Sequence, residues 1–225
     1  MTKYISLLFI TLLSLNISAQ ENKAKTILDK VSAINKEYTS VKAEFTFNMD
    51  NAEEDVHESS DGNIILKGNK YRLYLMDVYT YFDGKTIYQH LVDAEEVNIK
   101  EPDEDDEEEG LNPTQIFSLY ETGFKFSYVE EQTVTTTTTS YKTSTTTSSF
   151  HVIDLFPLDE ERPFSRIRLH IDTKTLEMKS LVSIGKDGNN ITIKIKKFEP
   201  NIDFKDSDFV FDQVANPDVE VVDMR

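Results

Sequence analysis

The sequence has no cysteine and no tryptophan, and only 7 glycines and 6 prolines occur among its 225 residues. Without cysteine it cannot form a disulfide framework, a thiolate metal site, a cysteine nucleophile or a lipid-modified N-terminal cysteine. The low glycine and proline content excludes a collagen-like chain or one long linker. Basic residues are also scarce: 24 Lys and Arg against 41 Asp and Glu give a net charge of −17. This charge repels phosphate backbones, so we expect no nucleic-acid partner.

Motifs that carry catalysis or cofactors are missing as well. The four histidines are isolated, since none lies two, three or four residues from another, and metal-ligand spacing is therefore absent. The sequence contains no glycine-rich phosphate loop, no G-x-S-x-G and no H-E-x-x-H. We expect no enzymatic activity, no cofactor and no metal. An exported hydrolase that uses scattered carboxylates stays a minor alternative.

The chain has only one long apolar run, Ile5–Leu15, which follows Lys3 and precedes the small residues Ser18 and Ala19. The run is too short to cross ~30 Å of hydrocarbon. The pattern is typical of a secretory signal peptide over residues 1–19. We expect cleavage before Gln20 and a soluble, exported domain over residues 20–225.

Hydrophobic periodicity predicts a mainly β protein. Spacings of three and four over residues 22–38 predict an amphipathic helix, and Asn112-Pro113 followed by Gly123 brackets a second, shorter one. No βαβ rhythm occurs, so an antiparallel sheet or barrel of about ten or eleven strands is favoured. We expect these strands among thirteen strand-like segments: residues 43–49, 62–67, 70–76, 78–82, 85–91, 97–100, 124–129, 152–155, 166–171, 176–184, 191–195, 209–211 and 219–222.

Two polar segments interrupt this pattern. Residues 101–109 contain eight acidic residues, and such a dense block of like charge predicts a solvated loop. Residues 133–149 contain ten threonines and four serines, which predicts either an exposed edge hairpin or a disordered loop. We expect no chemistry in residues 133–149. Residues 101–109 lack the glycine and ligand spacing of a calcium-binding loop, so we expect no specific metal site there.

The strongest signal is apolar. Phe45, Phe47 and Met49 alternate with polar residues, and residues 62–67 and 70–76 show similar one-sided stripes. Periodicity alone does not distinguish a filled core from a ligand cavity. A curved sheet of about ten strands encloses more volume than two short helices fill, which favours a cavity.

The order of elements resembles the outer-membrane lipoprotein carrier family, the LolA-like periplasmic proteins. The resemblance is carried by AKTILDKVSAINKEYTSVKAEFTF, GNIILKGNKYRLYL, YFDGKTIYQH, NPTQIF and DSDFVFDQVANPDVEVVD. It covers roughly residues 22–100, 111–130 and 150–225, and the two polar segments look like insertions. The resemblance implies an incomplete antiparallel β-barrel with a helical lid over an apolar cavity.

The resemblance also implies a function. Acylated lipoproteins would bind in the cavity between an inner-membrane lipoprotein-releasing transporter and an outer-membrane lipoprotein receptor, with no catalysis, and we expect a monomer. Lys67 stands where the family often has a lid-latching arginine. A related β-shell that binds or senses a free lipid or glycolipid remains an alternative. We expect these side chains to line the cavity: Phe45, Phe47, Met49, Ile64, Leu66, Tyr71, Leu73, Leu75, Tyr81, Ile87, Ile116 and Leu119.

Overall fold

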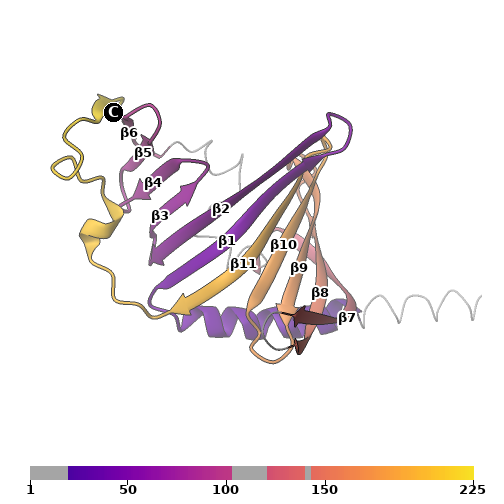
Figure 1. The fold of residues 1–225 in the computed structure, drawn as a ribbon. Helices are drawn as coiled ribbons and strands as arrows, with labels where there is room; N and C mark the ends of the chain where they lie inside the picture. Colours follow the sequence, from indigo (N-terminus) through magenta and orange to yellow (C-terminus); the bar gives the residue numbers. More distant parts are fainter. Residues whose placement is uncertain (1–19, 103–120, 140–142) are drawn as a thin grey trace, which may run out of the picture.

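The computed structural model describes residues 20–102, 121–139 and 143–225, and Figure 1 shows their arrangement. Residues 20–36 form a helix. A 3₁₀ turn, η3, lies at Asp206–Phe209 between β11 and β12. The described residues form twelve strands: β1 Val41–Asn51, β2 Val56–Lys67, β3 Lys70–Leu75, β4 Val78–Phe82, β5 Ile87–Leu91, β6 Glu96–Lys100, β7 Phe124–Thr139, β8 Thr143–Pro157, β9 Phe164–Asp172, β10 Met178–Gly185, β11 Asn190–Pro200 and β12 Glu220–Asp223.

All twelve strands belong to one open sheet with the order β12-β6-β5-β4-β3-β2-β1-β11-β10-β9-β8-β7. Its two ends, β12 and β7, do not pair with each other, so the sheet is an incomplete barrel (Figure 1). Consecutive strands form antiparallel hairpins within β1–β6 and within β7–β11, and β1 joins the two halves by pairing with β11. The predicted fold class is therefore confirmed, with twelve strands rather than ten or eleven.

One strand pair departs from the antiparallel prediction. β12 runs parallel to β6, with Glu220 opposite Glu96 and Asp223 opposite Ile99. The chain reaches this edge by crossing the sheet, because η3 contacts β3 and Phe211 contacts Tyr81 of β4 and His90 of β5. The periodicity of the sequence indicates which side chains are buried. It does not indicate whether two neighbouring strands run parallel or antiparallel.

Tight turns join the short strands in the β2–β6 half. Gly68, between β2 and β3, has a φ of 61°, a left-handed conformation that glycine adopts without a Cβ clash. Asp83 accepts backbone N–H bonds from Lys85 and Thr86 in the β4–β5 turn, and this pattern is typical of aspartate in turns. Gly68-Asn69 and Asp83-Gly84 therefore lie at strand boundaries. Asp61-Gly62, which looks like a turn in the sequence, lies inside β2 instead.

The helix covers one part of the sheet. Its buried residues Ala24, Ile27, Leu28 and Val31 follow the predicted spacing of three and four. They pack on β7–β10, and Figure 1 shows the helix lying across the lower ends of these strands. Ile153, Leu155 and Ile167 beneath it have no exposed surface. This helix-covered cluster is a closely packed core.

Candidate functional site

Strand registers show which side chains share the face of the sheet that carries the helix. Ile153 pairs with Leu169, Leu169 with Leu181, and Leu181 with Ile193, all of which lie on the helix side. The same face continues across β11 to β1, where Ile193 pairs with Phe47. It then crosses β2 to β3, where Ile64 pairs with both Ala43 and Leu73.

A second apolar cluster occupies this continuation of the helix-bearing face. Among the described residues, only Tyr38 contributes to it from outside the sheet. We call it the β1–β3 cluster, although β11 also contributes. Its buried members are Val41, Ala43, Phe45, Ile64 and Leu66, and its partly buried members are Tyr38, Phe47, Tyr71, Leu73, Leu75, Ile193, Ile195 and Phe198.

The structure brings most of the predicted lining residues into the β1–β3 cluster: Phe45, Phe47, Ile64, Leu66, Tyr71, Leu73 and Leu75. Met49 and Ile87 lie on the same face by register, because Met49 pairs with Ile191, and Ile87 with Phe82 and Phe82 with Tyr71. Both are half-buried beside the cluster. Ile116 and Leu119 lie outside the described residues, as do the predicted signal peptide and nearly all of the acidic segment. The contribution of β11 was not predicted.

The placement of Tyr81 corrects the prediction. Tyr81 pairs with Arg72, whose neighbours Tyr71 and Leu73 face the cluster, so Tyr81 lies on the opposite face of the sheet. Its ring contacts Phe211 at 6.3 Å between centroids and stacks with Tyr79 at 6.0 Å. Burial raises the pKa of its hydroxyl. Tyr81 therefore packs against the C-terminal segment, by which we mean residues 204–211.

Lys67 is also on that opposite face, because it follows Leu66 of the β1–β3 cluster on β2. Its Nζ donates a hydrogen bond to the Phe204 carbonyl and lies 3.9 Å from an Asp206 carboxylate oxygen. Lys70 also reaches Asp206, at 3.1 Å, and lowers the pKa of that carboxyl. Lys67 therefore fastens the C-terminal segment, which corrects its expected position at a lid over the cavity.

The C-terminal segment makes a third apolar contact with the sheet. Residues 209–211 were predicted to form a strand, and this prediction is wrong. Phe209 is fully buried, in edge-to-face contact with Phe204 at 6.2 Å. Phe211 meets the His90 ring at 5.1 Å, and burial lowers the pKa of His90. A strand is replaced by a 3₁₀ turn here because the Asp208 carboxylate accepts the Lys205 backbone N–H and closes the turn.

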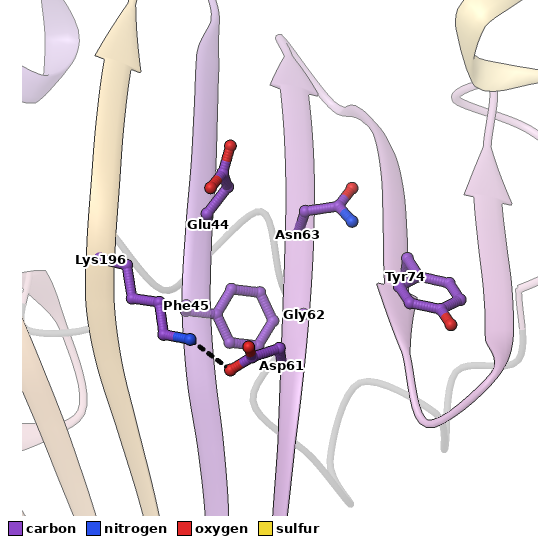
Figure 2. A pocket seen from close by; sticks show the side chains of 7 residues that line it. All are labelled: Glu44, Phe45, Asp61, Gly62, Asn63, Tyr74 and Lys196. Atoms are coloured by element: carbon purple, nitrogen blue, oxygen red, sulfur yellow. Dashed lines mark hydrogen bonds and ion pairs between the residues drawn. The ribbon is translucent and has the colours of Figure 1, made fainter.

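Figure 2 shows a pocket of about 230 Å³ in the middle of the sheet, at β11, β1, β2 and β3. Five of its seven lining residues carry polar or charged groups: Glu44, Asp61, Asn63, Lys196 and the phenol of Tyr74. Lys196 pairs with Asp61 at 2.5 Å and lowers the pKa of that carboxyl. An acyl chain would remove water from these polar and charged groups, so the pocket does not suit a lipid tail.

Gly62 explains the close packing beneath this pocket. A Cβ on Gly62 would lie 2.5 Å from the Phe45 ring, so only glycine lets the ring rest against β2. Figure 2 shows the Phe45 ring directly beside Gly62. Phe45 is therefore both a buried member of the β1–β3 cluster and part of the lining of the polar pocket.

Glu121 is held by two side chains of the helix. Ser32 Oγ donates to the Glu121 carboxylate, and Lys36 lies 3.0 Å from it. Both interactions lower the pKa of Glu121.

Within the described ranges, no three His, Asp or Glu side chains gather as metal ligands. No helix among the described residues is long and apolar enough to cross a membrane.

An open, curved sheet with a helix over part of one face, and an apolar cluster beside that helix, defines a LolA-like fold, which is consistent with binding of a lipid or lipoprotein. The chain belongs to the family described as outer membrane lipoprotein carrier protein LolA, whose model matches residues 14–155. No curated protein matches the chain.

Solved structures resemble it at low sequence identity. An uncharacterized conserved protein from Thermus thermophilus shares 12% identity, with a TM-score of 0.49, over 89% of this chain and 99% of that one. A putative outer membrane lipoprotein-sorting protein domain from Vibrio parahaemolyticus shares 8%, with a TM-score of 0.46, over 84% and 97%. The Mycobacterium tuberculosis lipoprotein LppX shares 15%, with a TM-score of 0.43, over 80% and 99%.

Proposed function

We propose that the protein is a non-enzymatic periplasmic carrier that binds the acyl chains of lipoproteins on the β1–β3 cluster. In this role it accepts lipoproteins from an inner-membrane releasing transporter and delivers them to an outer-membrane receptor. Residues 1–19 direct its export, and no cofactor takes part. Family membership supports the carrier role, and the β1–β3 cluster supports the position of the binding surface.

The observation that carries this proposal is a difference in burial along one face. Under the helix, Ile153, Leu155 and Ile167 are completely buried. In the β1–β3 cluster, Phe47, Leu73 and Ile193 lie on the same face and remain partly exposed. An apolar face that is filled on one side and still accessible on the other suits an apolar ligand.

The energetics of transfer fit such a surface. Each CH₂ group withdrawn from water contributes ~0.8 kcal/mol, so an acylated protein does not leave a membrane for water unaided. A carrier must offer apolar contact of comparable quality and later release it. The cluster provides Phe and Tyr rings, whose large flat surfaces accommodate chains of variable shape.

A charge substitution tests the surface. Leu73→Glu places a carboxylate on the partly exposed part of the cluster, and we expect a folded protein that no longer binds a dipalmitoylated lipopeptide. Lys194→Glu is the matched control, because Lys194 is exposed on the opposite face of β11 between Ile193 and Ile195. We expect this control to bind normally. A folded Leu73→Glu protein that still binds the lipopeptide would end this assignment of the site.

Native mass spectrometry of protein isolated from its own periplasm identifies the cargo. A bound acylated protein supports lipoprotein transport. A bound free lipid or glycolipid would instead support the related β-shell that binds lipid without transfer. Both results keep the cluster as the site, so the measurement separates the two functions and the Leu73→Glu variant tests the surface itself.

A further inference from the structure

The threonine- and serine-rich segment forms a β-ribbon that extends beyond the rest of the sheet. β7 and β8 stay paired from Thr133 opposite Ser149 to Thr139 opposite Thr143. The next strand, β9, pairs with β8 only between Phe150 and Leu155. We call residues 133–139 and 143–149 the Thr/Ser ribbon. Seven pairs at ~3.4 Å per residue give it a length of roughly 24 Å.

The ribbon has no apolar face of its own. Residues 133–137 and 145–147 are exposed, and the hydroxyls of one face meet across the strands. Thr133 Oγ1 lies 3.1 Å from Ser149 Oγ, and Thr135 Oγ1 lies 3.4 Å from Thr147 Oγ1. An isolated two-stranded ribbon is at best marginally stable in water, so this one would gain from a further strand.

The outer edge of β7 is the place where such a strand would add. β7 is the last strand of the sheet, so along its described length one row of backbone N–H and C=O groups has no strand partner. β8 is less available, because the Thr173 backbone N–H already donates to the Ser149 carbonyl at the base of the ribbon. Natural edge strands are usually blocked by lysine, proline or a bulge. Residues 133–139 of β7 contain no lysine and no proline.

The neutrality of the Thr/Ser ribbon allows a second copy of the same chain to pair there despite the acidic body. The protein carries a net charge of −17, which opposes self-association over most of its surface. Residues 133–139 and 143–149 carry no charged side chain. Two ribbons overlapping along ~24 Å would hold the two acidic bodies apart by more than the ~8 Å Debye length at physiological ionic strength. Antiparallel pairing of β7 with its own copy around Thr136 also places threonine opposite threonine, except where Val134 meets Thr138.

We propose that the Thr/Ser ribbon is a self-association surface, on which the β7 edges of two copies pair antiparallel around Thr136 to form a weak dimer. Such a dimer departs from the monomer expected from the sequence. It leaves the helix and the β1–β3 cluster outside the interface. The interface is small and polar, so the dimer forms only at high local concentration.

Sedimentation velocity between about 10 µM and 1 mM tests the proposal, with Thr136→Lys as the disrupting variant and Thr146→Lys as its control. Thr136 and Thr146 are directly paired exposed threonines, one on β7 and one on β8, so both variants add the same charge to the same face. In the dimer, Thr136→Lys sets two lysines directly opposite each other, and like charges in that position destabilise pairing. We expect the dimer Kd to rise about fivefold or more for Thr136→Lys and to change less than twofold for Thr146→Lys.

Two further readouts make the test decisive. Higher salt should strengthen the wild-type dimer, because it screens the repulsion between the acidic bodies and removes no attraction from the neutral ribbon. Hydrogen exchange should slow with protein concentration in residues 133–139 and remain constant in residues 143–149. A wild-type protein that is monomeric at 1 mM, or a dimer that both variants weaken equally, would overturn the proposal. So would a ribbon that pairs with an added foreign peptide and never with itself.

Discussion

The helix-covered cluster and the β1–β3 cluster lie on one face of one sheet, yet they differ in burial. Leu169 beneath the helix is 1% exposed, whereas Leu73 remains partly exposed. Helix length accounts for much of the difference. The described helix, residues 20–36, is roughly 25 Å long at 1.5 Å per residue. The eight strands from β7 to β3 are roughly 34 Å wide at ~4.8 Å per spacing. A single helix packed on β7–β10 therefore leaves β1–β3 to other parts of the chain or to a ligand.

The comparison is tested most strongly by truncating one leucine in each cluster. Leu169→Ala should lower the free energy of unfolding by about 2–5 kcal/mol, because it leaves a cavity in a filled core. Leu73→Ala should cost only about 1–2 kcal/mol, because part of its surface already meets solvent. Urea denaturation of both variants measures this difference. Equal costs would show that the two clusters are packed alike.

An intermediate loss of stability is expected from substituting Lys67, which holds the C-terminal segment on the other face of the sheet. Lys67→Met should remove the donor to the Phe204 carbonyl and cost about 1 kcal/mol, with faster hydrogen exchange over residues 204–211. Lys70→Met is the comparison, because among the described residues the ion pair of Lys70 is with the exposed Asp206 carboxylate. We expect it to change exchange less. Loss of lipopeptide binding in Lys67→Met would instead connect this lysine to the β1–β3 cluster.

Acid should weaken the contact between His90 and Phe211 of the C-terminal segment. Burial lowers the pKa of His90 in the folded state. The unfolded chain therefore binds a proton more readily, and stability present above pH ~6.5 is lost as the pH falls below that value. Burial also lowers the pKa of His151 and His170, so several groups act in the same direction. Melting temperatures at pH 7 and pH 5.5 should differ less for His90→Gln than for the wild type; an unchanged difference would exclude a contribution from His90.

The smallest effect is expected from removing the Thr/Ser ribbon. Joining Gln132 to Phe150 through an Asn-Gly turn deletes residues 133–149 and preserves the last pair below the ribbon, since these two residues face each other. The ribbon buries little, and loop closure changes by only ~0.6 kcal/mol per doubling of length. We expect the melting temperature and lipopeptide binding to stay nearly unchanged. Loss of cooperative melting would show that the ribbon supports the sheet.

Sequence periodicity predicted the face of β1 and β3 because polar and apolar residues alternate there and only one face is apolar. It failed at Tyr81 because β4 has buried neighbours on both faces: Tyr79 and Tyr81 pack near Phe211, and Phe82 packs on Tyr71. The same limit hid the C-terminal segment, since Phe209 and Phe211 alternate like a strand. The pairing of β1 with β11 joins residues far apart in the sequence, and a local pattern does not reveal such a pairing. The contribution of β11 to the cluster was therefore not predictable.

The pairing of β1 with β11 has a consequence for how the protein folds. The β1–β6 and β7–β11 meanders need only contacts between consecutive strands, whereas Phe45 must find Ile195 near the other end of the chain. Contacts this distant in sequence slow folding, because the entropy of closing the long loop is lost before the pairing is gained. We therefore expect the two meanders to form first and the β1–β11 seam to close last. Ile193, Ile195 and Phe198 all come from β11, so the β1–β3 cluster is completed only in that final step.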